Sequence, residues 1–200
     1  MTPSRKALRE ATANAHDRVD AAFADFDLAD REGYARFLAA HADVVWPLEA
    51  ELPGERVIAD WEERKRGHLL SEDLAFLRSA FRHPREGGDP EPQAMSSIAL
   101  DPRLRGDDGS WDAPVIAGTL YVLEGSRLGG KFLARRLPAG FPRAYLDADQ
   151  RAEKWQQLLR VIDGLLREPL ALDAALAAAL ATFTAFERSA EKWRRAEIGQ

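Results

Sequence analysis

Apolar residues recur every three or four positions along most of this 200-residue sequence, and no segment alternates convincingly between apolar and polar residues. This period is that of an α-helix with one buried face, whereas a half-buried strand would alternate. The spacing predicts helices over about residues 4–24, 31–51, 72–81, 113–137, 148 to the 160s, and 172–196. The chain is long enough for one domain with a core of its own. We therefore predict an all-α fold, a single-domain helical bundle over residues 1–200.

Three residues bear on where these helices begin and end. Ser4 is a candidate N-cap for the first helix, because its hydroxyl can accept a hydrogen bond from a backbone N–H of the first turn. Pro47 lies inside the second helix and predicts a kink or an early end. Pro138 is expected to end the fourth helix. The apolar stripe of the first helix consists of Leu8, Ala11, Ala15, Val19 and Ala22.

Residues 83–110 break the helical pattern, since they are dense in Gly, Pro and Asp and carry several turn signals. A loop this long inside a compact domain is uncommon and is either functional or disordered. The segment resembles peptides translated from mobile palindromic repeats that insert into bacterial reading frames. We predict a disordered surface insertion without a role, because lengthening a surface loop costs little free energy. An active-site lid is the alternative.

The sequence contains no cysteine. Disulfides, thiolate nucleophiles, Cys-ligated zinc and iron–sulfur clusters are therefore excluded, and a cytoplasmic location is expected. The net charge of −5 argues against a general nucleic-acid binder, which needs clustered Lys and Arg. No apolar run approaches the roughly 20 residues of a membrane span, and the N-terminal residues lack the apolar core of a secretory signal. We expect neither nucleic acid nor a membrane as a partner.

Among the four histidines, His16 has the best-defined setting. On a helical wheel it lies beside Phe23 at the edge of the apolar stripe, so it can point into a pocket. Asp20 follows four residues later and lies on the same face one turn away. A carboxylate often orients a metal-bound histidine through its second ring nitrogen. Taken alone, the pair more often marks a half-buried structural histidine.

The other three histidines have no partner that spacing can identify. His68 follows a charged run and is expected to be solvated. His41 lies in an apolar stretch and could be a core histidine with its hydrogen bonds satisfied. His83 falls in the irregular segment and is set aside.

The predicted helix over 113–137 contains Gly118, Gly125, Gly129 and Gly130. Each glycine inside a helix costs roughly 1 kcal/mol relative to alanine, so four in one helix require a reason. Gly118, Gly125 and Gly129 lie on one face, where the backbone can be approached closely. Another helix crossing there is the interpretation that packing alone favours, and a flat ligand such as a porphyrin is the other.

Two segments together resemble the haem oxygenase family, in particular its bacterial branch found alongside bacteriophytochromes. They are LREATANAHDRVD, residues 8–20, and YVLEGSRLGG, residues 121–130. The resemblance covers most of the chain apart from residues 83–110, and it extends to the TFTAFE segment at 182–187. It implies a haem oxygenase-like fold.

The resemblance also implies roles for individual residues. His16 would be the proximal ligand of the haem iron, supported by Asp20, and Arg9 would contact a haem propionate. The glycine-rich helix would cover the other haem face, with Gly125 and Ser126 at the catalytic positions. Ser126 stands where some branches carry an aspartate that organises water, and its hydroxyl can still hold a water. The implied haem-binding positions are Arg9, Thr12, Asp20, Tyr121, Val122, Gly125, Ser126, Gly129 and Gly130.

The implied activity is O2- and electron-dependent cleavage of haem to biliverdin, CO and Fe2+, with haem as both substrate and cofactor. A reductase or a ferredoxin would be the external electron donor. The biliverdin would supply a bacteriophytochrome, or the reaction would serve iron acquisition. The alternatives are a non-catalytic haem-binding or haem-carrier protein on the same fold, a relative that binds another small molecule, and a protein damaged by the inserted segment.

Overall fold

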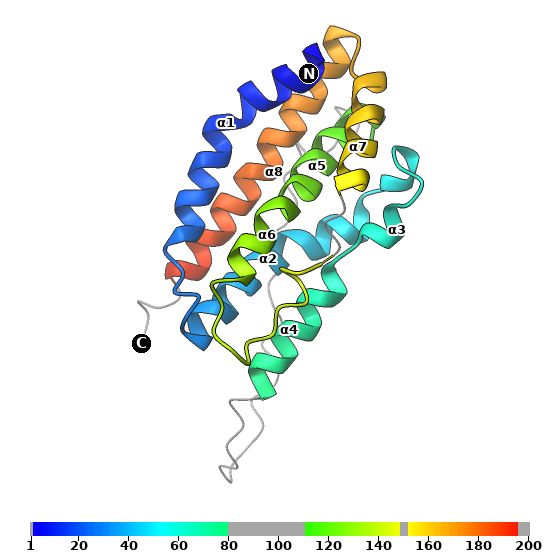
Figure 1. Ribbon diagram of the computed structural model, residues 1–200. Helices are drawn as coiled ribbons and strands as arrows, with labels where there is room; N and C mark the ends of the chain where they lie inside the picture. The colour runs from blue at the N-terminus through cyan, green and yellow to red at the C-terminus, as the bar shows by residue number, and fades with distance from the viewer. Residues whose placement is uncertain (1, 80–110, 149–151, 196–200) are drawn as a thin grey trace.

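The computed structural model describes residues 2–79, 111–148 and 152–195 (Figure 1). Every regular element within these ranges is a helix, which confirms the all-α prediction. The predicted insertion at 83–110 lies outside the described residues. The elements are α1 Pro3–Ala24, α2 Arg31–Glu51, the 3-10 helix η1 Gly54–Arg56, α3 Trp61–Arg64, α4 Gly67–Ser79, α5 Ala113–Gly125, α6 Arg127–Ala134, α7 Ala152–Leu165 and α8 Pro169–Arg195.

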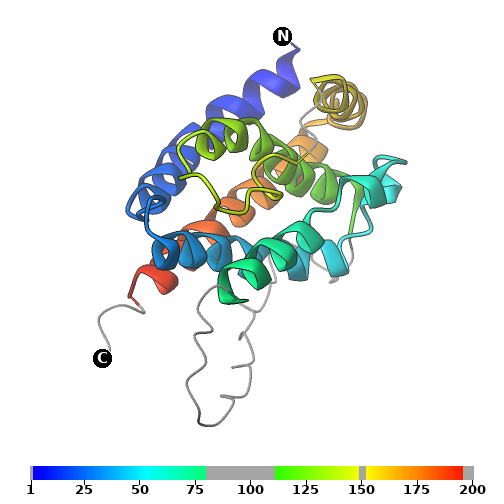
Figure 2. The ribbon, with the colours of Figure 1, turned by 60° about the horizontal axis from the view of Figure 1, so that its bottom comes forward.

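Helix α8 is the centre of the bundle and packs against α5, α1 and α2, while α4 packs against α2. Figures 1 and 2 show α1 and α5 running along α8, with α2 and α4 crossing below them. Alanines such as Ala175 and Ala179 are fully buried on α8, so neighbouring helices approach it closely. In this arrangement α1 faces α5 and α6 across a cavity that Phe183 and Phe186 of α8 also line.

By length and composition, α8 is apolar enough to cross a membrane. This corrects the expectation that no segment of the sequence qualifies. In the fold the helix contacts three other helices, and it buries Phe183 and Phe186 together with its alanines. Its position in the core accounts for part of this apolar character, because 39% of the apolar window is buried.

The crossing of α5 and α8 explains one of the four glycines. A Cβ added to Gly118 would lie 2.1 Å from the carbonyl oxygen of Ala175, so only glycine allows the two backbones to approach this far. A Cβ added to Gly129 would meet nothing within 4 Å. Gly118 is therefore required by the helix crossing and Gly129 is not, although both lie on one predicted helix face.

This difference gives a matched pair of stability predictions. Gly118→Ala is expected to lower the free energy of unfolding by about 1–3 kcal/mol, because the backbones must separate to admit a methyl group. Gly129→Ala is expected to raise it by about 1 kcal/mol through helix propensity alone. Urea unfolding of both variants at neutral pH checks the signs. Equal effects would mean that the α5–α8 crossing relaxes without cost.

Several helix starts differ from the predictions. Helix α1 begins at Pro3 with Thr2 as its N-cap, because proline suits the first helical position. The Ser4 hydroxyl instead donates to the carbonyl oxygen of Leu166 at 2.8 Å. Helix α8 begins at Pro169 rather than near residue 172 for the same reason. The described part of α7 begins at Ala152, and residues 149–151 lie outside the described ranges.

Helix α4 begins at Gly67, five residues before the predicted start at 72. The Glu49 carboxylate of α2 accepts the backbone N–H groups of Arg66 and Gly67, each at 2.7 Å. This cap comes from a distant segment of the chain, so local sequence does not reveal it. Sequence spacing also missed the short elements η1 and α3. Helix α2 has the predicted bounds and continues through Pro47 to Glu51. Of the two alternatives predicted at this proline, a kink or an early end, the early end is wrong.

The predicted helix over 113–137 is two helices, α5 and α6, that meet at Ser126. In an unbroken helix the carbonyl oxygen of Leu123 would accept the N–H of Arg127. Here it accepts the Ser126 hydroxyl at 2.7 Å and an Nη2–H of Arg66 at 3.1 Å. Side chains thus replace the backbone donor, which is a recognised cause of helix bending. Helix α6 ends at Ala134 and tighter turns carry the chain to Leu137, just before Pro138.

Candidate functional site

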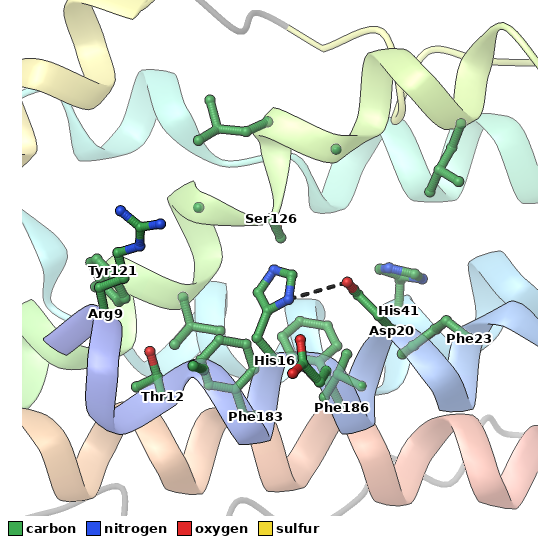
Figure 3. A pocket seen from close by; sticks show the side chains of 18 of the residues that line it. Arg9, Thr12, His16, Asp20, Phe23, His41, Tyr121, Ser126, Phe183 and Phe186 are labelled. Carbon is green, nitrogen blue, oxygen red and sulfur yellow. Dashed lines mark ion pairs between the residues drawn. The ribbon is translucent and has the colours of Figure 1, made fainter.

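A cavity of about 590 Å³ lies between α1 on one side and α5–α6 on the other (Figure 3). This volume is within the usual range for small-molecule sites, about 300–1,000 Å³. The predicted site residues that line it are Arg9, Thr12, His16, Asp20, Tyr121, Val122, Gly125, Ser126 and Gly129. Gly130 is buried and is not among the lining residues, because adjacent helical residues point about 100° apart. The two segments therefore meet at one cavity.

His16 projects from α1 toward the middle of the cavity (Figure 3). Its Nδ1 lies 3.1 Å from the Asp20 carboxylate, and 59% of its side chain is exposed. The ring meets Phe183 of α8 edge-on, with the ring centroids 5.9 Å apart. A carboxylate at Nδ1 favours the tautomer in which Nε2 carries a lone pair. The arrangement thus leaves a basic nitrogen available at the centre of the cavity.

The wall across from His16 includes two positions without a side chain, Gly125 and Gly129. A Cβ on Gly125 would come no closer than 3.7 Å to Trp155, and one on Gly129 would meet nothing within 4 Å. The surroundings of these two glycines differ from those of Gly118, which is in tight contact with α8. Gly118 serves the helix crossing, whereas Gly125 and Gly129 leave room beside the cavity for a flat ligand.

One end of the cavity is polar and cationic. Arg9 and Thr12 of α1 lie there beside Tyr121 of α5 (Figure 3). The Thr12 hydroxyl donates to the carbonyl oxygen of Leu8 at 2.7 Å. Burial raises the pKa of Tyr121, while the neighbouring Thr12 and Arg9 act against that rise. A guanidinium and neutral hydroxyls at one end can hold an anionic group of a ligand.

The other end of the cavity is aromatic and contains His41, which sequence reasoning treated only as a core histidine. Its Nδ1 lies 2.9 Å from the carbonyl oxygen of Phe37, one turn earlier on α2. Its ring centroid is 4.4 Å from those of both Phe23 and Phe37, and 5.8 Å from that of Phe186. His41 therefore satisfies one hydrogen bond in the core and also lines the cavity. No local signal places α2 at this wall, because α2 reaches it only through tertiary packing.

The burial of His41 predicts a pH dependence of stability. Burial lowers the pKa of His41 from 6.5 to about 4, the bond to Phe37 acts against this shift, and the charge of Arg66 adds to it. The unfolded chain therefore binds a proton at higher pH than the folded chain does. Above about pH 6.5, His41 should have no effect on the free energy of unfolding. As the pH falls from there toward 4, the free energy of unfolding should decrease by up to about 3 kcal/mol. Below about pH 4, His41 should cause no further decrease.

The variant His41→Phe should lack this component. Urea unfolding at pH 7 and pH 5, compared between the natural protein and the variant, isolates the contribution of His41. Because a phenylalanine ring fits among the same aromatic neighbours, we expect the variant to be at least as stable at pH 7. Parallel losses in the two proteins would contradict a buried neutral His41.

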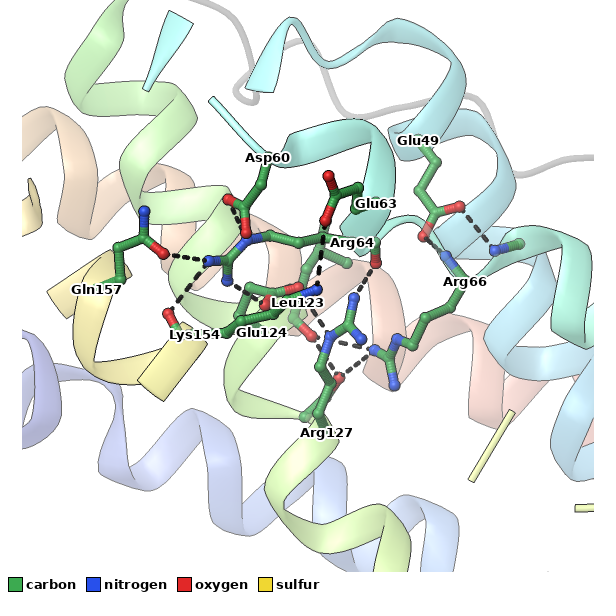
Figure 4. Close-up of polar contacts among 12 residues, drawn as sticks. Glu49, Asp60, Glu63, Arg64, Arg66, Leu123, Glu124, Arg127, Lys154 and Gln157 are labelled. Atoms are coloured by element: carbon green, nitrogen blue, oxygen red, sulfur yellow. Dashed lines mark hydrogen bonds and ion pairs between the residues drawn. The ribbon is translucent and has the colours of Figure 1, made fainter. Parts of the chain in front are cut away.

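Buried charged side chains surround the junction of α5 and α6, next to Gly125 and Ser126 (Figure 4). The fully buried Arg64 side chain donates to Glu124 and to Asp60, each at 2.8 Å. Arg127 donates to the second oxygen of Glu124, also at 2.8 Å, and to the carbonyl oxygen of Arg64. Burial lowers the pKa of Arg64, but the bonds to Asp60 and Glu124 outweigh it and raise that pKa overall. The network fixes the segment on which Gly125 and Ser126 stand.

Ser126 is connected to the same region through Arg66. The Ser126 hydroxyl donates its proton to the carbonyl oxygen of Leu123 and accepts an Nη2–H of Arg66 at 2.9 Å. A hydroxyl oxygen has two lone pairs, so one remains for a further donor. Sequence reasoning identified Ser126 but missed Arg66 and Glu124, which lie 60 and 2 residues from it in the chain.

Comparisons with known proteins agree with this geometry. Residues 3–192 match the family model described as "Heme oxygenase". A protein named "Heme oxygenase" from Xanthomonas campestris pv. campestris (strain 8004) is 30% identical over 166 residues, which are 78% of this chain and 88% of that protein. Because the family match spans nearly the whole chain and both matching segments line one cavity, the chain belongs to the haem oxygenase family.

Proposed function

We propose that this protein cleaves haem to biliverdin, CO and Fe2+, using O2 and electrons from an external donor. The observation that carries the proposal is His16, oriented by Asp20 and facing the bare backbone of Gly125 and Gly129 across the cavity. Haem, when bound, supplies the iron that activates O2 and also the carbon that is oxidised. The residues of the chain need only bind, orient and supply hydrogen bonds.

On the α1 side, Nε2 of His16 would hold the haem iron. Asp20 would keep the imidazole in its ligating tautomer and make it more basic. Arg9, seven residues before His16 and on the same face of α1, would pair with a haem propionate. Thr12 and Tyr121 beside it would add neutral polar contacts. This set of donors fits a flat dianionic ligand with a central metal.

On the α5–α6 side, Gly125 and Ser126 would take the catalytic positions. Gly125 leaves space next to the ligand. The Ser126 hydroxyl has already donated its proton to Leu123, so it can accept a hydrogen bond from a water but does not itself deliver a proton there. We infer that Ser126 positions water, with Arg66 holding the hydroxyl in place, and that protons arrive through water.

The remaining assignments follow from the proposed reaction. The electron donor would be a reductase or a ferredoxin of the cytoplasm. Biliverdin would be passed to a bacteriophytochrome, or released iron would be the useful product. Supply of biliverdin and release of iron both follow from the same cleavage of haem held by His16, so one assay of that cleavage tests the reaction.

The proposed function is tested by adding haemin to the purified protein, then ascorbate or a ferredoxin system in air, and recording the absorption spectrum. We expect the Soret band to decay while a broad band near the red end grows in. A protein that binds haem but keeps its Soret band under reductant and O2 would be a haem-binding or haem-carrier protein, and the proposed reaction would be wrong.

A further inference from the structure

Trp155 of α7 borders the cavity beside Gly125, toward the end where Arg9 lies. All three residues line the cavity. The indole of Trp155 packs on Tyr121, with the ring centroids 5.6 Å apart and the rings tilted by 39°. Its Cη2 atom would lie 3.7 Å from a Cβ added to Gly125. The carbon end of the indole, opposite its N–H, therefore stands at the edge of the space that Gly125 leaves open.

One buried guanidinium holds Trp155 and Gly125 in place relative to each other. The fully buried Arg64 side chain donates to Glu124, the residue before Gly125, at 2.8 Å. The Nη2 of Arg64 also donates to the carbonyl oxygen of Lys154, the residue before Trp155, at 3.3 Å (Figure 4). Helices α5 and α7 are thus joined at the two residues that precede this edge of the cavity. The indole is a fixed boundary, and not a side chain that can easily swing away.

Charge alone does not determine how haem would be turned in this cavity. Among the described residues that line it, Arg9 is the one lysine or arginine. Haem has two propionates on neighbouring pyrroles, a quarter turn apart, and a guanidinium can pair with either of them. The two resulting ring positions bring different meso bridges to the same place in the cavity. A second feature of the cavity is therefore needed to select one position.

The indole of Trp155 can make this selection. In one ring position the propionate that Arg9 leaves unpaired is turned toward the indole, and in the other an edge with methyl and vinyl groups lies there. A carboxylate placed against carbon atoms loses water without gaining a hydrogen bond. Methyl and vinyl groups gain from the same contact. The position that keeps the unpaired propionate away from Trp155 is therefore favoured.

We propose that Trp155 is a specificity-determining residue, whose indole fixes the in-plane orientation of the bound haem and thereby the meso bridge at which the ring is opened. The opening of the ring rests on the proposed function, whereas the orientation needs only haem binding. Trp155 neither holds the iron nor moves a proton. Its replacement should therefore change which isomer of biliverdin forms more than it changes how fast haem is consumed.

The first test reads the orientation of haem without turnover. Haemin and cyanide are added to the full-length protein, and proton NMR records the haem methyl signals, whose shifts depend on how the ring is turned relative to the axial histidine. Trp155→Phe keeps a ring beside Tyr121 but lacks the reach toward Gly125, and Trp155→Ala removes the ring. We expect both variants to show methyl signals that the natural protein lacks. Gln156→Ala, at an exposed position next to Trp155, should keep the natural signals.

The second test separates the biliverdin isomers by chromatography after reaction with ascorbate in air. We expect one principal isomer from the natural protein and a change of roughly 10-fold in the isomer ratio for Trp155→Ala, as for one lost apolar contact. Trp155→Phe should show a smaller change in the same direction. Natural methyl signals or an unchanged isomer ratio in both variants would overturn the role of Trp155 and leave the proposed function standing.

Failure of the proposed function has a different signature. Haem that binds to the natural protein but yields no biliverdin would overturn the proposed reaction. The methyl signals of Trp155→Phe and Trp155→Ala would then decide by themselves whether Trp155 orients the ring, because they require no turnover.

Discussion

His16→Ala is expected to form no biliverdin and to lose the axial nitrogen ligand of the bound haem. The reason is geometric: His16 is the lining residue at the middle of the cavity whose Nδ1 is held by a carboxylate, at 3.1 Å from Asp20. The loss of haem affinity should exceed the 10–100-fold that removal of an outer partner of a ligand typically costs. The absorption spectrum of the ferric complex and a haem titration measure both effects. Added imidazole should restore the spectrum, because the shortened side chain leaves room for it.

Two further variants separate ligation from other effects. Asp20→Asn keeps the size of the side chain and removes its charge, so we expect haem affinity to fall by roughly 10-fold. His68→Ala removes an exposed histidine of α4 and should change neither affinity nor spectrum. If His16→Ala keeps the spectrum of the natural protein, another nitrogen holds the iron and the assignment of His16 is wrong.

The local parts of this site could be predicted from the sequence. His16 and Asp20 are four residues apart on one helix, and the helical period alone brings them to the same side. The glycines at 118, 125 and 129 likewise share a face, but their separate uses depend on what lies opposite. Only the fold places the backbone of Ala175 against Gly118 and open space beside Gly129.

The parts that sequence reasoning missed depend on contacts between distant segments. Arg66 reaches Ser126 from 60 residues away, and Glu49 caps α4 from 17 and 18 residues away. Helix α5–α6 was predicted as one element because its sequence is helical throughout, and Ser126 keeps helical backbone angles. The break arises because the Arg66 and Ser126 side chains take the Leu123 carbonyl. The helical spacing of apolar residues in a sequence identifies a helix. It does not identify a hydrogen-bond donor that a distant segment of the chain contributes.

Glu124→Ala is expected to lower the free energy of unfolding by about 3–5 kcal/mol. Both oxygens of the buried Glu124 carboxylate accept guanidinium N–H groups, from Arg64 and Arg127 at 2.8 Å each. The side chain of Arg64 is fully buried and that of Arg127 is 8% exposed. Removing the shared carboxylate takes one acceptor from Arg127 and leaves Arg64 with Asp60 as its carboxylate partner. Both guanidiniums have poor access to water, so the loss costs more than the ion pair itself contributes. Urea unfolding at neutral pH measures the change.

The same substitution should also loosen the wall of the cavity. Glu124 directly precedes Gly125, and its partners Arg64 and Arg127 join α3 to the start of α6. We therefore expect Glu124→Ala to weaken haem binding, even though Glu124 itself does not line the cavity. Glu124→Gln keeps the shape and one acceptor oxygen and should show a smaller loss of both stability and haem affinity.

A matched control and a double variant identify the cause. Glu10 forms an exposed pair with Lys6 at 3.8 Å, and Glu10→Ala should change stability by no more than about 0.5 kcal/mol, because water screens that pair. If stranded charge explains the loss in Glu124→Ala, replacing Arg127 and Glu124 together by leucine should cost less than Glu124→Ala alone. A loss below about 1 kcal/mol in Glu124→Ala would mean that water reaches both guanidiniums and that packing, not charge, maintains the junction of α5 and α6. A double variant less stable than Glu124→Ala would also mean that packing maintains the junction. The loss of stability would then depend on how many side-chain contacts are removed, not on the charge left behind.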